Sequence, residues 1–149
     1  MDTGAPCIFC EIAAGRAPSS LVYEDDLALA FLDIQPVNPG HTLVIPRFHY
    51  ASLAELDETI GGHLFKVAQR IAQALRETGL RCEGVNLFLA DGEAAFQDVF
   101  HVHLHVLPRF SGDSFKIHAD CSSQPDRAAL DQIASSIHDV YQRLWKIGG

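Results

Sequence analysis

The stretch HVHLHVL (101–107) places a histidine at every second position, with valine or leucine between. Side chains alternate across a β-strand, so this pattern predicts a strand with histidines on one face and apolar residues on the other. The first face carries His101, His103 and His105, and the second, which should pack into the core, carries Val102, Leu104 and Val106. We expect Pro108 to end the strand, because proline has no N–H for the ladder.

The rest of the chain predicts four further strands and two main helices. Apolar, β-branched runs bounded by turn residues predict a hairpin over 21–34, joined at Glu24–Asp26, and strands over 41–46 and 84–90. Apolar residues at three-and-four spacing predict one helix between Asp57 and Gly79 and a second after Pro125, and a short helix is expected over 7–14. Hairpin strands with segregated helices predict an α+β fold on a five-stranded antiparallel sheet.

The composition is that of an ordinary globular protein, with 149 residues, 48% of them hydrophobic and 20% charged. This length suits one domain with a real core. Eleven basic against nineteen acidic residues give a formal charge of −8, which argues against binding to a nucleic-acid polymer or an anionic membrane. No apolar run is long enough to span a bilayer and no signal-peptide pattern is seen, so we expect a cytoplasmic protein.

Three histidines on one face of a strand have three interpretations. An imidazole can act as a nucleophile, a proton carrier or a metal ligand near neutral pH. A half-exposed strand with polar residues outward would be served equally well by Thr, Lys or Glu, so it does not explain the choice of histidine. Rings about 6–7 Å apart along one strand splay too far to converge on one tetrahedral ion. The pattern therefore favours catalysis over a metal site made by the strand alone.

Residues 97–107, QDVFHVHLHVL, resemble the signature of the histidine triad (HIT) family, in which alternating histidines follow a glutamine four positions before the first. The resemblance continues through FLDIQPVNPGHTLVIPRFH (31–49) to CIFCEI (7–12). It covers roughly residues 7–113 and implies the HIT-like fold for a single HIT domain over 1–149 with a tail at 1–6. The C-terminal helical extension at 114–149 is predicted from helix periodicity alone. Family members commonly form homodimers that extend the sheet across the interface.

The resemblance further implies a nucleotidyl hydrolase or transferase that acts at the α-phosphorus of purine nucleotide conjugates. His103 matches the nucleophile, which forms a nucleotidyl-histidine intermediate that hydrolyses in a second step. Its ring must present a bare nitrogen, so we expect a backbone carbonyl from a neighbouring segment to hold the other nitrogen as N–H. His105 matches a donor to the phosphate, His41 a hydrogen-bond partner near the triad, and His101 the first triad position. No catalytic metal is required.

Seven residues match nucleotide-binding positions: Leu32, Asp33, Ile34, Gln97, Asp98, Val99 and Arg109. Asp33 matches an acid that accepts hydrogen bonds from both ribose hydroxyls, and its two neighbours are expected in the walls of the base pocket. From the residues alone, a solvated strand end explains Asp33 equally well. Gln97 matches an amide that contacts the phosphate. Arg109 is a candidate anion clamp and equally a surface residue of a turn.

Cys7 and Cys10 have the two-residue spacing of metal ligands. By itself this half-site also fits a redox dithiol or two inert thiols. Some bacterial family members complete a zinc site with the histidine of a Pro-Arg-x-His motif and the first triad histidine, here His49 and His101. Two thiolates and two imidazoles form a closed tetrahedral set, so the resemblance implies a structural zinc ion.

Three residues before the triad depart from the family pattern: Ala90 replaces Asn or Gln, Phe96 replaces Gly, and Asp98 replaces Ser or Thr. A hydroxyl donates to phosphate oxygens, whereas a carboxylate repels them. An inward-facing Asp98 would therefore disfavour polyphosphate leaving groups and tolerate an amine, as in the Hint-like branch. Against this, Leu107–Arg109 with Gly112–Asp113 resembles the Fhit-like branch, which cleaves diadenosine polyphosphates.

These observations leave several functions open. The first is hydrolysis of purine nucleotide conjugates such as adenosine phosphoramidates. The second is a diadenosine polyphosphate hydrolase or phosphorylase, and the third is a nucleotide-binding interaction protein with weak catalysis. A metal-binding regulatory module that uses Cys7, Cys10 and the histidines is the fourth.

Overall fold

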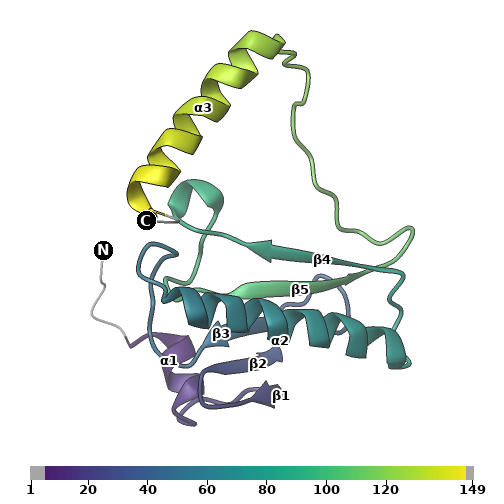
Figure 1. The fold of residues 1–149 in the computed structure, drawn as a ribbon. Coiled ribbons are helices and arrows are strands. Elements are labelled where there is room, and N and C mark those ends of the chain that lie inside the picture. The colour runs from purple at the N-terminus through teal and green to yellow at the C-terminus, as the bar shows by residue number, and fades with distance from the viewer. Residues whose placement is uncertain (1–5, 147–149) are drawn as a thin grey trace. The chain divides into compact units, whose positions relative to one another are not determined.

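The computed structural model describes residues 6–146, and the chain divides into two units between Phe115 and Lys116. The first unit contains five strands in one antiparallel sheet, in the order β1-β2-β3-β5-β4 (Figure 1). Its elements are α1 (Ile8–Ala13), β1 (Leu21–Glu24), β2 (Ala28–Leu32), β3 (Thr42–Pro46), α2 (Glu58–Glu77), β4 (Gly84–Leu89), the 3-10 turn η1 (Glu93–Ala95) and β5 (Leu104–Arg109). The predicted α+β fold on a five-stranded antiparallel sheet is confirmed.

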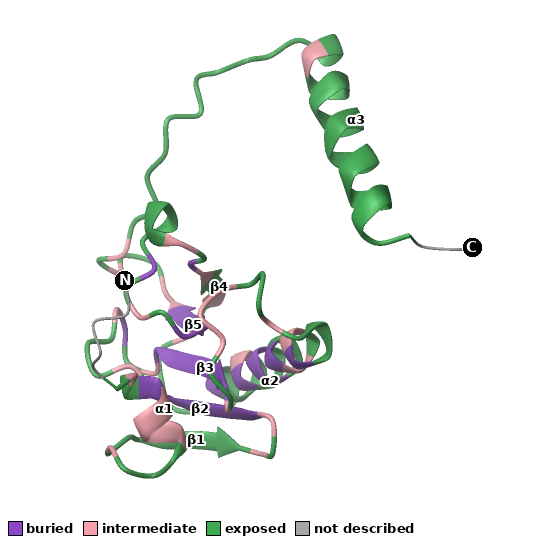
Figure 2. Ribbon diagram, turned by 90° about the vertical axis from the view of Figure 1, so that its left-hand side faces the viewer, coloured by how far each residue is buried: buried purple, intermediate pink, exposed green. Residues whose placement is uncertain are grey.

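The two faces of the sheet are covered by different helices. One buried cluster joins α2, through residues such as Leu64 and Ile71, to Val44 of β3 and Val106 of β5. The other joins Phe9 of α1 to alternate residues of β2 and β3, among them Phe31. Figure 2 shows the resulting burial, with the central strands and the inner side of α2 in purple. Because side chains alternate along β5, the face opposite Val106 lies on the α1 side of the sheet.

Two predicted local signals are present in α2 and in the turn before β3. Asp57 is the N-cap of α2, and its side chain accepts a hydrogen bond from the backbone N–H of Ile60. Gly40 has a φ of +96°, and a Cβ at this position would lie 2.9 Å from side-chain carbons of Leu75 and Leu80. A residue without a side chain is therefore needed where the chain turns into β3.

The predicted strand over 101–107 is wrong at both ends. The strand β5 begins only at Leu104, since the backbone N–H of Val102 bonds to the carbonyl of Tyr50 outside the sheet. It also continues through Pro108, which pairs with Val85 of β4. Proline is tolerated there because β3 pairs with β5 only from Leu104 to Val106, so no strand on that side needs its N–H.

The second unit contains α3 (Arg127–Leu144), capped at its N-terminus by Asp126. The apolar residues predicted for one face of this helix are present, but within residues 116–146 no side chain is buried. Of the predicted tail at 1–6, residues 1–5 lie outside the described part of the chain. None of the helices found between residues 6 and 146 combines the length and apolar character needed to cross a bilayer.

Candidate active site

His103 is buried, and its two ring nitrogens face different partners. Nδ1 lies 2.8 Å from the backbone carbonyl oxygen of His101, so it must carry the proton and donate it. In the neutral ring, Nε2 then keeps a bare lone pair. A backbone carbonyl holds this nitrogen, as predicted, but it does not come from a neighbouring segment. The carbonyl comes from two residues earlier, where the chain has not yet joined the sheet and this oxygen has no ladder partner.

A chain of hydrogen bonds sets the opposite arrangement in His105. The backbone N–H of Val37 donates to Nδ1 of His41 over 3.1 Å, so the proton of neutral His41 is on Nε2. That Nε2 lies 2.8 Å from Nδ1 of His105 and donates to it. His105 therefore carries its own proton on Nε2. His103 and His105, with ring centroids 5.0 Å apart, thus pair a bare nitrogen with an N–H donor.

Burial favours the neutral forms of His41 and His105. It lowers the pKa of His41, and it is the main reason that the pKa of His105 falls to about 4, with a smaller contribution from the neighbouring His103. A neutral His105 can still donate through Nε2. His105 therefore retains its N–H donor at neutral pH without adding a fixed positive charge.

A cavity of about 460 Å³ opens beside these two rings, between α1, the ends of β2 and β3 and the segment before the triad. Seven of the residues predicted as site residues line it: Leu32, Asp33, Ile34, Asp98, Val99, His103 and His105. Most of the remaining lining is apolar. Ile34 is 94% exposed, which leaves a large apolar side chain at the cavity rim, available to a ligand. The cavity has the size and character of a small-molecule site.

The sequence did not identify the wall that α1 contributes. Ile8, Phe9 and Ile12 line the cavity, and the ring of Phe9 meets that of His103 edge to face at a centroid distance of 5.2 Å. A short helix over 7–14 was expected, but which strand it would cover depends on the tertiary fold.

Asp98 faces the cavity. Its Oδ1 lies 3.4 Å from Nε2 of His103 and accepts a hydrogen bond from the backbone N–H of Val99. The distance to His103 exceeds the roughly 2.7–2.9 Å of a charge-assisted hydrogen bond, so the lone pair of Nε2 remains available. The Asp98 side chain is 82% exposed, which places a carboxylate at the open edge of the site.

Two residues predicted to bind phosphate do not line the cavity. The buried side chain of Gln97 accepts from the backbone N–H of Gly92 and donates to the carbonyls of Ala51 and Val99. Its amide thus holds together the turn that presents Asp98. These contacts satisfy Gln97 without a ligand.

Arg109 belongs to a separate cluster at the end of β5. Its guanidinium makes two hydrogen bonds with Asp113 and further ones with Asn86 and the carbonyl of Phe115. The hydrogen bonds from Arg109 hold the pKa of Asp113 well below its usual range, and Asn38 bonds to the same carboxylate. This network anchors the chain after β5, and it provides no support for an anion clamp.

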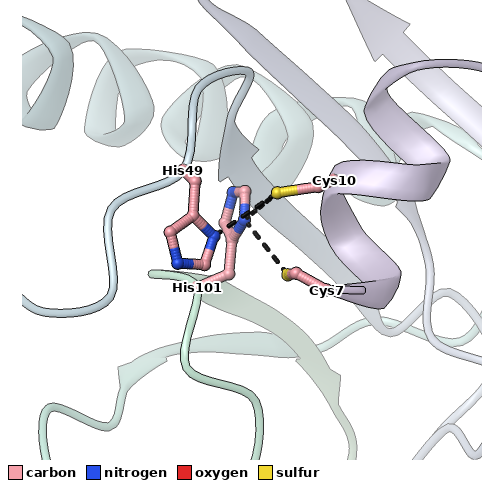
Figure 3. A group of neighbouring side chains, drawn as sticks. All are labelled: Cys7, Cys10, His49 and His101. Atoms are coloured by element: carbon pink, nitrogen blue, oxygen red, sulfur yellow. Dashed lines mark hydrogen bonds between the residues drawn. The ribbon is translucent and has the colours of Figure 1, made fainter. Parts of the chain in front are cut away.

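The four predicted zinc ligands lie together (Figure 3). Cys7 and Cys10 come from the start of α1, His49 from the segment after β3, and His101 from the start of the triad. Each Sγ lies 3.6 Å from Nδ1 of His101, and that of Cys10 lies 3.3 Å from Nδ1 of His49. A tetrahedral ion with Zn–S of about 2.3 Å and Zn–N of about 2.0 Å separates sulfur from nitrogen by about 3.5 Å, so the spacing fits zinc.

The protonation of this cluster also fits a metal. Nε2 of His101 donates to the carbonyl of Pro46 over 2.9 Å, which leaves Nδ1 bare and directed at the thiols. Burial lowers the pKa of His101, which favours the neutral, ligating form. Burial is also the main cause that raises the pKa of Cys10 to about 11, with Cys7 adding to it. A raised pKa disfavours the thiolate that would bind a metal, and a cation would offset this by stabilising the thiolates.

A second group, Asp33, His41 and His105, is equally compact but does not fit a metal. To ligate through Nε2, neutral His41 would need its proton on Nδ1. The backbone N–H of Val37 already points at that atom, and two N–H groups would then face each other. This group is better described as a hydrogen-bond relay.

Comparison with known proteins identifies the family, since the family model of the HIT domain matches residues 14–112. The chain belongs to the HIT family. A HIT family protein from Bacillus anthracis has a solved structure 41% identical to this HIT protein, with a TM-score of 0.83 over 90% of this chain and 96% of that one. This agreement confirms the HIT-like fold.

Two further relatives bear on the chemistry. The structure of a Zn-bound histidine triad family protein from Mycobacterium smegmatis is 45% identical, with a TM-score of 0.72 over 87% of this chain and 96% of that one. The adenylylsulfatase HINT3 of Arabidopsis thaliana is 34% identical over 138 residues, which cover 92% of this chain and 68% of the relative. By its family, this HIT protein binds or hydrolyses nucleotides.

Proposed function

We propose that this HIT protein hydrolyses purine nucleotide conjugates, adenosine phosphoramidates among them, through a nucleotidyl adduct on His103. The observation that carries the proposal is the tautomer of His103, whose Nδ1 is tied to a carbonyl while Nε2 faces a nucleotide-sized cavity. A neutral imidazole with a bare nitrogen attacks phosphorus readily, and the resulting bond hydrolyses easily.

The cavity walls provide a place for each part of a nucleotide. Leu32 and Ile34 offer apolar surface to a base. Between them Asp33 offers a carboxylate, which suits two ribose hydroxyls because it has only acceptor sites. The Nε2–H of His105 is directed to donate to a non-bridging phosphate oxygen, where charge builds up during attack.

The first chemical step follows from this arrangement. Nε2 of His103 forms a bond to the α-phosphorus, and the bond from phosphorus to the leaving group breaks. The leaving atom takes the electron pair and a proton from solvent, which reaches the site at its open edge beside Asp98. AMP is then attached to His103 until water releases it in a second step.

Replacement of the nucleophile tests the proposal directly. His103→Ala should reduce turnover of adenosine 5′-phosphoramidate by at least about 10⁴-fold, with nucleotide binding retained. Rapid-quench labelling of the unaltered protein with α-phosphate-labelled substrate should capture an adduct on His103. His118→Ala, which removes an exposed histidine from the second unit, is the control and should behave as the unaltered protein. Full activity in His103→Ala would overturn the proposal.

Asp98 favours an amine over a phosphate chain as the leaving group. A carboxylate about 4 Å from a phosphate repels it by about 1 kcal/mol in water-like surroundings, or about fivefold. Asp98→Ser should therefore raise kcat/KM for diadenosine polyphosphates about fivefold relative to the phosphoramidate. Adenylyl sulfate belongs in the same panel, given the plant relative. An unchanged ratio would remove Asp98 as the selecting residue.

The motif that favoured diadenosine polyphosphates has a structural explanation in the Arg109–Asp113 pair. Hydrolysis of diadenosine polyphosphates is tested by the same substrate panel, and the rival from another class is a nucleotide-binding interaction protein. Tight nucleotide binding with no adduct on His103 and no turnover of any of these substrates would favour that rival.

A structural zinc ion at Cys7, Cys10, His49 and His101 forms part of the same proposal. The sulfur–nitrogen distances and the Zn-bound relative support it. Bound there, the ion would supply no chemistry to the phosphate. The ligand residues would link α1, which forms one cavity wall, to the carbonyl of His101 that orients the nucleophile.

We also propose a homodimer that extends the sheet through β4. This strand ends the sheet and exposes Leu87 and Phe88, and a groove of about 560 Å³ lies between it and α2. Unpaired edge strands with apolar side chains invite pairing with another strand. Native mass spectrometry should show a dimer that Leu87→Asp converts to a monomer, whereas a monomeric unaltered protein would refute this interface.

A further inference from the structure

Asp98 lies beside the reacting nitrogen and is free to contact solvent. Its Oδ1 is held by the N–H of Val99 and lies 3.4 Å from Nε2 of His103, while 82% of the side chain is exposed. The other carboxylate oxygen, Oδ2, has no hydrogen-bond partner recorded within residues 6–146. An anchored carboxylate with one open oxygen can accept a proton from a nearby water.

The geometry of displacement at phosphorus puts that water within reach. Attack and departure occur roughly in line, so the leaving group departs from the side of phosphorus opposite His103. In the second step water must attack from that same side, because His103 is now the leaving group. One position at the cavity mouth is therefore occupied first by the departing amine and then by the attacking water. Asp98 lines the same cavity and is mostly exposed, so we infer that its carboxylate can reach a water at this position.

We propose that Asp98 is the general base that activates water to release AMP from His103. This inference rests on the proposed function. Water oxygen forms a bond to phosphorus while the bond from phosphorus to Nε2 breaks, and its electron pair returns to the ring. The proton from water passes to the Asp98 carboxylate and then to solvent, so no other reactant is needed.

The other groups lining the cavity do not fit this role. His105 carries its proton on Nε2 and has Nδ1 occupied by His41, so it can donate but not accept. Asp33, the second carboxylate of the cavity lining, accepts from the N–H of Gln35 and lies 3.6 Å from Nε2 of His41. It lies on the relay side of the site, beside His41.

Asp98→Asn separates the two steps of the reaction. The amide oxygen keeps the bond from Val99 but cannot accept a proton. In rapid-quench experiments with labelled adenosine 5′-phosphoramidate, formation of the adduct should stay within about threefold of the unaltered protein. Its breakdown should slow by about 100-fold or more, as expected for loss of a general base. A burst of amine release should then precede slow turnover, and kcat and KM should fall together.

Glu93→Gln is the matched control, since it removes one negative charge from the turn just before Asp98 without touching the cavity lining. It should leave both steps unchanged. If Asp98→Asn clears its adduct as fast as the unaltered protein, the proposal is overturned. If Glu93→Gln slows breakdown equally, the effect is one of overall charge, and the proposal is overturned as well.

A rescue experiment distinguishes a base from a residue that merely positions the site. Azide carries no proton, so its attack on the adduct needs no base. It should speed adduct loss at least tenfold in Asp98→Asn, forming adenosine phosphorazidate, and less than twofold in the unaltered protein. A slow variant that azide does not rescue would contradict the assignment. Absence of any adduct in the unaltered protein would instead refute the proposed function, so the two failures are distinguishable.

Discussion

The two ends of the histidine row differ in how their second ring nitrogen is used. At the first end, His101 is fully buried, with one nitrogen on the carbonyl of Pro46 and the other directed at two thiols. At the other end, His103 and His105 each use one nitrogen for a protein contact and turn the other toward the cavity. Three side chains of one type on one stretch thus divide into one that faces the thiols and two that face the cavity.

This difference teaches that the partner of the first nitrogen decides the role of the second. In His103, Nδ1 donates to a carbonyl, so Nε2 is bare. In His105, Nδ1 accepts a hydrogen bond, so Nε2 carries the proton. The four predictions below challenge this division, beginning with the largest expected effect on the free energy of unfolding.

Removal of zinc should affect the His101 end most. Chelation, or Cys10→Ser, should lower the free energy of unfolding by about 4 kcal/mol if the ion is present at about a thousand times its dissociation constant. Thermal unfolding with and without chelator measures the effect, and native mass spectrometry should count one ion per chain. Cys121→Ser, at an exposed cysteine, should change neither value. If chelation leaves the free energy of unfolding unchanged, the structural role proposed for the His101 end is refuted.

Acidification should lower the free energy of unfolding through His105. Above about pH 6.5 the ring is neutral in both folded and unfolded chains. As the pH falls toward 4, the unfolded chain gains a proton that the folded one refuses, because burial lowers the pKa of His105 to about 4. The contribution of His105 to the free energy of unfolding should thus fall by at most about 3 kcal/mol between these pH values.

Urea titrations of chelator-treated protein at several pH values measure this loss without the metal contribution. His105→Gln should flatten the curve between pH 6.5 and 4. A loss of the same size in this variant would mean that other groups cause it.

The third prediction concerns Arg109, whose guanidinium bonds to protein groups, as the ring of His101 does. It tests whether such a side chain has a structural role. Arg109→Lys keeps the charge but loses the paired hydrogen bonds to Asp113, which should lower the free energy of unfolding by about 2 kcal/mol. The KM for the phosphoramidate should change by less than about twofold. A tenfold rise in KM with unchanged stability would restore the anion clamp that the sequence suggested.

Phe96 gives the smallest expected effect, in the turn that presents Asp98. It has a φ of 67°, a left-handed conformation that favours glycine, and the turn is closed by bonds from its N–H to Glu93 and from Gln97 to Gly92. Phe96→Gly should therefore raise the free energy of unfolding by about 1 kcal/mol. A loss of stability would show that the exposed ring makes contacts that outweigh the backbone strain.

Much of the fold could be predicted because its signals are local. The capping aspartate and apolar spacing of α2, the hairpin of β1 and β2, and the alternation around Val106 each depend on residues close in sequence. The limits of β5 were wrong because they depend on partners. Whether Pro108 can sit in a strand is decided by how far β3 extends beside it.

The candidate site divides in the same way. The residue types of the triad, the two-residue cysteine spacing and the departure at Asp98 could be seen in the sequence. The placement of Arg109 and Gln97 could not, because each side chain has a long reach and its partners come from distant segments.

By itself, the sequence determined the HIT family, the antiparallel α+β fold and the set of residues from which a site could be built. Only the tertiary structure decided which nitrogen of each histidine is bare, which charged side chains face the cavity, and that α1 forms one of its walls. The physical reason is that periodicity and capping act within a few residues, whereas a tautomer is set by hydrogen bonds. In this protein, two of the four hydrogen bonds that set these tautomers join residues more than 50 positions apart in the chain.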